Sequence, residues 1–158
     1  MNKAFVAALG KIIIFPVTLL TMGISINTVF AQKNTIINSS NLYKPLPING
    51  STEIKDTLSD QDIPTGQGGF ARDYTMKLTK GDNLAIDLSS DNFDSIITLL
   101  SPNGSTVAEN DDGPDGTSNS LLFTRITQTA TYIIRVRSFG ETGLGKFQLK
   151  VTKLQPVK

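Results

Sequence analysis

The stretch Lys146-Phe147-Gln148-Leu149-Lys150-Val151-Thr152 decides the fold class of this chain. Phe147, Leu149 and Val151 alternate with polar residues, so apolar side chains recur with a period of two. This period is typical of a β-strand with one buried face, because successive side chains point to opposite sides of a strand. The stretch therefore predicts a half-buried strand near the C-terminus.

The same alternation recurs upstream, in segments closed by turn residues. Residues 74–78, 84–88 and 132–136 show it, and a weaker strand is expected over 52–58. The nearly continuous apolar run 96–100 is typical of a central strand covered on both faces. No segment after the N-terminal one shows a sustained helical period. We therefore predict an all-β fold, an antiparallel two-sheet β-sandwich of about eight strands.

The N-terminal segment is expected to be a signal peptide, residues 1–31. Lys3 and Lys11 precede or flank an apolar run, and Val29 and Ala31 supply the small residues that signal peptidase requires. An uncleaved membrane anchor is the alternative, although polar residues interrupt the apolar run. Residues 32–50 are polar and aperiodic and predict a flexible arm, and residues 51–154 form the predicted domain. We expect a secreted or periplasmic protein with no membrane contact after cleavage.

Two residue types are absent, and both absences limit the chemistry. With no Cys, an exported domain must be stable without disulfides. With no His, Ser-His-Asp catalysis, His-ligated zinc and the usual general base near neutral pH are excluded. The chain has 15 basic and 14 acidic residues, and cleavage of the signal peptide would remove Lys3 and Lys11. The net charge is therefore close to zero, which argues against nucleic acid as a partner.

Short motifs follow one another in a fixed order through residues 73–151. They are Asp73-Tyr74-Thr75-Met76, Gly81-Asp82-Asn83-Leu84, Phe93-Asp94-Ser95, Ser101-Pro102-Asn103-Gly104, Ala108-Glu109-Asn110-Asp111-Asp112-Gly113, Thr117-Ser118-Asn119-Ser120, Ala130-Thr131-Tyr132-Ile133-Ile134-Arg135-Val136 and Gly145-Lys146-Phe147-Gln148-Leu149. The series resembles the bacterial pre-peptidase C-terminal domain family over residues 51–154. The resemblance implies a jelly-roll-like β-sandwich and a non-catalytic accessory role, either attachment to a substrate or surface or assistance to a secreted partner protein.

Acidic residues concentrate in two of the predicted loops and have two interpretations. Carboxylates in loops repel one another unless a cation neutralises them, and Ca²⁺ accepts six to eight oxygen ligands in flexible geometry. A calcium ion bridging the two loops would stabilise a domain without disulfides. Alternatively, Asp, Asn and Gly are ordinary turn residues here. The candidate calcium ligands are Asp94, Asp111 and Asp112, with amide oxygens from Asn110 and Asn119.

Arg135, Arg137 and Phe139 lie on one face of a predicted strand and form a candidate ligand patch. Arginine and aromatic side chains together suit acidic sugars or a peptide carboxylate. The alternative is an ordinary solvated strand face. A polysaccharide or a protein at the cell surface is the expected ligand.

An enzyme is not expected. A carboxylate-dependent hydrolase, the enzymatic alternative, needs two acids held across a cleft, one of them with a raised pKa. Asp111 and Asp112 are adjacent in a loop that the sequence predicts to be solvated. The sequence therefore favours a secreted accessory or binding domain over a structural protein of the cell envelope and over a small hydrolase.

Overall fold

The computed structural model describes residues 43–66, 68–114, 116–140 and 142–155, and these contain ten strands and no helix. The predicted signal peptide and residues 32–42 of the predicted arm lie outside the described residues. No helix of the described residues has the length and apolar character that crossing a membrane requires. The all-β prediction is therefore confirmed for the part of the chain that the structure describes.

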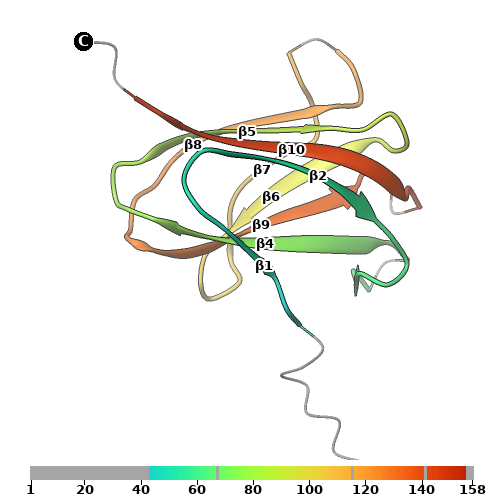
Figure 1. Ribbon diagram of the computed structural model, residues 1–158, viewed down its shortest axis with the longest axis horizontal. Coiled ribbons are helices and arrows are strands. Elements are labelled where there is room, and N and C mark those ends of the chain that lie inside the picture. Colours follow the sequence, from blue (N-terminus) through green and yellow to red (C-terminus); the bar gives the residue numbers. More distant parts are fainter. Residues whose placement is uncertain (1–42, 67, 115, 141, 156–158) are drawn as a thin grey trace, which may run out of the picture. The chain divides into compact units, whose positions relative to one another are not determined.

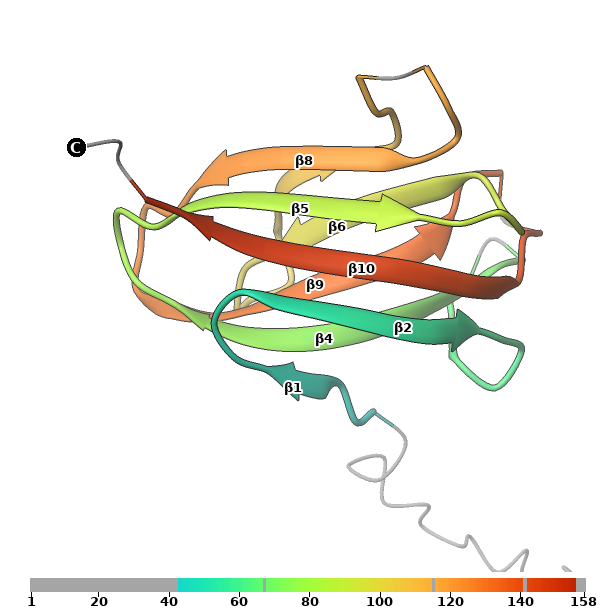
Figure 2. The same cartoon turned by 45° about the horizontal axis from the view of Figure 1, so that its top comes forward.

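The strands form two sheets that face each other (Figures 1 and 2). Sheet A has the order β1-β4-β9-β6-β7, with β3 also paired to β4, and sheet B has the order β2-β10-β5-β8. All pairs are antiparallel except β1–β4, which is parallel. The bounds in sheet A are β1 (Leu46–Ile48), β3 (Ile63–Pro64), β4 (Phe70–Leu78), β6 (Ser95–Leu100), β7 (Thr106–Asn110) and β9 (Ala130–Ser138), and those in sheet B are β2 (Thr52–Leu58), β5 (Asn83–Ser89), β8 (Ser120–Arg125) and β10 (Gly145–Leu154).

Two short strands account for the difference from the eight that the sequence predicts. Strand β1 has three residues and β3 has two, and each pairs with the same edge of β4. Residues 46–48 were expected in the flexible arm, but the structure places them in β1. The domain boundaries themselves stay a prediction.

Alternate side chains of both sheets fill one core. Leu149 and Val151 of β10 are fully buried, as are Ile134 and Val136 of β9 in the opposite sheet. At one end Phe93 and Phe147 meet edge to face, with ring centroids 6.3 Å apart. The period of two in the sequence thus becomes a layer of apolar side chains between the sheets.

A polar cluster links β2 of sheet B to β4 of sheet A. Arg72 Nε lies 2.7 Å from Asp56 Oδ2, and Arg72 Nη1 lies 2.7 Å from Asp62 Oδ1. Tyr74 Oη donates a hydrogen bond of 2.8 Å to the same oxygen of Asp56. Although burial opposes it, the hydrogen bonds from the Thr57 amide and Tyr74, together with Arg72, lower the pKa of Asp56.

Leu149→Ala should lower the free energy of unfolding by about 2–5 kcal/mol, because it leaves a cavity at the centre of the core. The neighbouring Lys150→Ala is the matched control, since Lys150 is exposed on the same strand. Its effect should stay within about 0.5 kcal/mol. Urea unfolding measures both values, and equal losses would contradict the core assigned here.

Asp56→Asn should make the protein less sensitive to acid. The contribution of the ionised Asp56 is complete above its ordinary pKa of 3.8 and is lost as the pH falls through the lower pKa of the folded state. Urea unfolding at about pH 7 and about pH 3 should therefore show a smaller drop in stability for Asp56→Asn than for the wild type. A drop of the same size in both would exclude this role for Asp56.

Candidate functional site

The predicted calcium ligands hold the loops together through hydrogen bonds. The Asn110 side-chain amide donates to the carbonyl oxygens of Asp112 and Leu121, both at 2.8 Å. Asn119 Oδ1 accepts a hydrogen bond of 3.1 Å from the Ser90 amide. The carbonyl of Asp94 accepts one of 2.8 Å from the amide of Phe139. Several polar groups of this set therefore already have partners inside the protein.

The carboxylates of the same set do not form a cluster. Among the residues that the structure describes, no three acidic side chains lie close enough together to hold a metal ion. Asp94, Asp111 and Asp112 would need such an arrangement to supply most of the oxygens that Ca²⁺ requires. Calcium binding thus stays a prediction.

The predicted ligand patch lies on the outer face of sheet A. Tyr132, Ile134 and Val136 of β9 face the core, so Arg135 and Arg137 face outward. Across the sheet, Arg135 is paired in register with Asp73 of β4 and Thr98 of β6. The structure thus brings the two arginines to one face, as the sequence predicts.

The guanidinium group of Arg135 is bound within the protein. Its Nε and Nη2 atoms donate to the two carboxylate oxygens of Asp73, at 2.8 and 2.9 Å. Tyr43 Oη donates to Asp73 Oδ2 at 2.7 Å. Burial and this hydrogen bond raise the pKa of the Tyr43 phenol to about 12, so the phenol remains a donor at neutral pH. Arg135 therefore forms an ion pair inside the protein, and its part in the ligand patch stays a prediction.

No pattern in the sequence signals this role of Asp73. Its position in the alternation of β4 places it on the outer face, yet the residue is only 3% exposed. The cause is the cover that Tyr43 and Arg135 provide from segments 30 and 62 residues away in the chain. Only the cross-strand pairing of β4 with β9 could have revealed the pair.

Arg137 and Phe139 line a hollow of about 430 Å³ with Ile96, Glu109 and Asp111. Arg137 Nη2 lies 3.2 Å from Glu109 Oε2, and Thr98 donates to the same oxygen at 2.6 Å. The hydrogen bond from Thr98, together with Arg137, lowers the pKa of Glu109. The hollow thus combines an apolar floor at Ile96 with a charged rim.

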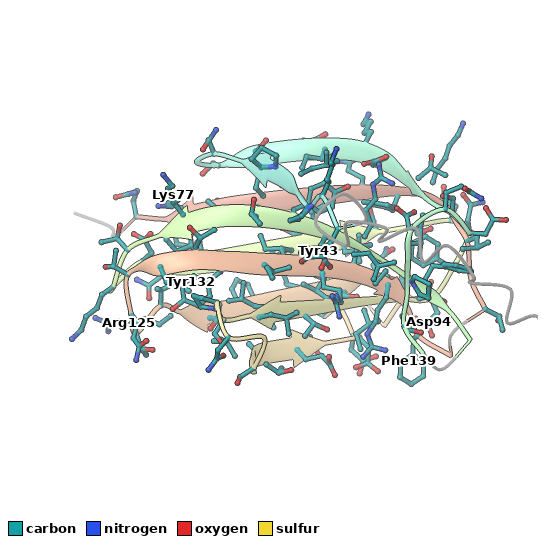
Figure 3. The ribbon with its side chains drawn as sticks, turned by 90° about the horizontal axis from the view of Figure 1, so that it is seen from below. Tyr43, Lys77, Asp94, Arg125, Tyr132 and Phe139 are labelled. Atoms are coloured by element: carbon teal, nitrogen blue, oxygen red, sulfur yellow. The ribbon has the colours of Figure 1, made fainter. Side chains whose placement is uncertain are left out.

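Phe139 is held at the rim by its backbone. Its amide donates to Asp94, as described above, and its carbonyl oxygen accepts a bond of 2.9 Å from Ser138 Oγ. The side chain nevertheless remains 52% exposed. Figure 3 shows the ring projecting outward beside Asp94. The structure thus presents an aromatic ring to solvent on a fixed backbone.

The fold and these surfaces define an antiparallel β-sandwich with an exposed arginine–aromatic hollow at one end. The family model of the bacterial pre-peptidase C-terminal domain matches residues 71–138. The resemblance predicted from the sequence is therefore confirmed over these residues.

Two solved structures share the fold. The pre-peptidase C-terminal domain of a collagenase from Bacillus anthracis has a TM-score of 0.55 at 14% identity, and the match covers 69% of this chain and 95% of that one. A periplasmic inhibitor of g-type lysozyme from Aeromonas hydrophila has a TM-score of 0.51 at 13% identity, covering 70% and 98%. No curated protein matches the chain.

Asp73→Asn should destabilise the protein by about 1–3 kcal/mol, because it removes the charge that compensates Arg135. Glu109→Gln is the control, since it weakens the more exposed ion pair with Arg137, and such pairs contribute about 0–1 kcal/mol. Chemical denaturation compares the two variants. A loss for Asp73→Asn no larger than that for Glu109→Gln would contradict the structural role of the buried pair.

Proposed function

We propose that this protein is a non-catalytic accessory domain, exported to the periplasm or the medium, that binds a protein partner through the Arg137–Phe139 hollow. The observation that supports this most directly is the half-exposed ring of Phe139 on a hydrogen-bonded backbone. Aromatic and arginine side chains dominate the binding energy of many protein interfaces. A backbone that is held in place before binding also loses less conformational entropy when the partner arrives.

The hollow has the composition of a small interface centre. Ile96 supplies an apolar floor, and Glu109 and Asp111 supply a polar rim beside Arg137. Apolar centres with polar rims are typical of protein interfaces. Because Glu109 partly neutralises Arg137, recognition would depend on shape and on the aromatic ring more than on net charge.

The solved neighbours agree with a binding role. The Aeromonas hydrophila protein is described as a lysozyme inhibitor, so a protein with this fold can act by binding another protein. At 13% sequence identity, this structural likeness supports the fold and does not identify a partner. Export rests on the signal peptide predicted over residues 1–31. Calcium stabilisation through Asp94 and the loop residues 110–112 and 119 stays a separate prediction.

A hydrolase is the weaker alternative. Acid catalysis by carboxylates requires a pair held across a cleft, one of them protonated at neutral pH. Glu109, the acid most directly held in this hollow, has a lowered pKa and donates no proton at neutral pH. This acid is suited to holding Arg137 and not to acting as the general acid.

Phe139→Ala and Arg137→Ala should each weaken binding of the partner at least about tenfold, as expected for residues at the centre of an interface. The test captures proteins from the secreted and periplasmic fractions of the producing organism with the immobilised processed chain, followed by titration of the captured protein. Phe123→Ala, which removes an even more exposed phenylalanine from sheet B, is the matched control and should bind like the wild type. Equal capture by wild type and Phe139→Ala would exclude the hollow as the binding site.

A further inference from the structure

Phe123 is the most exposed of the large apolar side chains that the structure describes, at 63%. It lies on β8, the edge strand of sheet B. Even-numbered residues of β5 and β8 face the core, so Phe123 and its odd-numbered neighbours form the outer face of the sheet. The residue directly opposite Phe123 on β5 is Ala85, whose small side chain leaves the ring uncovered. The ring therefore lies uncovered on the outer face of the sheet.

Polar side chains surround this ring. Asp87 and Asn83 are the diagonal neighbours of Phe123 on β5, and Arg125 follows two residues later on β8. Neighbouring strands are about 4.8 Å apart, so all three side chains can reach a ligand that covers the ring. A hollow of about 520 Å³ lies over this region, lined among others by Asn83, Phe123, Arg125, Leu154 and Gln155.

These polar groups have no partners inside the described part of the protein. Within residues 43–155 as described, the side chains of Asn83, Asp87 and Arg125 form no hydrogen bond or ion pair. The outer face of sheet A is different, since Arg135 donates to Asp73 there and Thr98 donates to Glu109. Sheet B thus presents both donors and acceptors that remain free to bind a ligand.

We propose that the outer face of sheet B around Phe123 binds a β-linked polysaccharide. A pyranose ring has a face of C–H groups that can stack on an aromatic ring, and its hydroxyl groups are both donors and acceptors. Asp87 can accept hydrogen bonds from hydroxyls, while Arg125 can donate and Asn83 can do both. Lys150 of β10 lies opposite Asp87, so this face carries charges of both signs around the ring.

The shape of the surface favours an extended polymer. The four strands of sheet B span about 14 Å from β8 to β2 at the usual strand spacing. Chains with β-1,4 linkages, such as cellulose, are extended, so they can lie along an exposed sheet face. Figure 3 places Arg125 and Phe139 at opposite ends of the view, so this surface is separate from the proposed protein-binding hollow.

The test is co-sedimentation of the processed full chain with insoluble cellulose and with purified peptidoglycan, with α-linked dextran gel as the negative control. We expect the wild type to bind at least one β-linked polymer and not dextran. Phe123→Ala should weaken binding at least about tenfold, and Asp87→Asn should weaken it measurably. Phe123→Tyr should retain binding, because it keeps the aromatic face.

Phe139→Ala is the matched control and should bind the polymer like the wild type, which separates this proposal from the proposed protein-binding function. The melting temperature of Phe123→Ala should equal that of the wild type, because the removed ring is exposed. Three results would overturn the proposal: no binding to either β-linked polymer, undiminished binding by Phe123→Ala, or binding to dextran equal to that to cellulose and peptidoglycan.

Discussion

Strand β9 imposes the constraint on which the rest of the structure depends. It is hydrogen-bonded to β4 on one side and to β6 on the other, so its register is fixed from both directions. Tyr132, Ile134 and Val136 on its inner face build the core, and Arg135 and Arg137 on its outer face build the charged rows of sheet A. Because successive side chains alternate, the packing of the core and the positions of the arginines are set by the same pairing.

Much of the fold could be predicted from the sequence, because long strands with one buried face have a visible period. Strands β4, β5, β9 and β10 show it clearly, and β6 appears as a continuous apolar run. Strands β1 and β3 were missed because two or three residues show no period. They exist because β4 offers them an open edge, which is a tertiary effect.

The candidate sites were predictable only where neighbours in sequence are also neighbours in space. Arg137 and Phe139 share one side of the same segment, and the structure places both on one hollow. Arg135 was expected with them, but Asp73 binds it from 62 residues away. The sequence analysis missed the surface around Phe123 for a similar reason. Its polar neighbours lie on β5 and β8, which are separated in the chain by β6 and β7 of sheet A.

The two short strands on the edge of β4 have a further consequence. Strand β3 covers this edge at Phe70 and Ala71, and β1 covers it from Tyr74 to Met76. An uncovered edge would expose unpaired amide and carbonyl groups that pair readily with another chain. Strand β1, which precedes β2, therefore protects this edge against aggregation. A shortened chain that begins at Ser51 would lose Ile48 from the core and would tend to join its β4 to that of a second molecule.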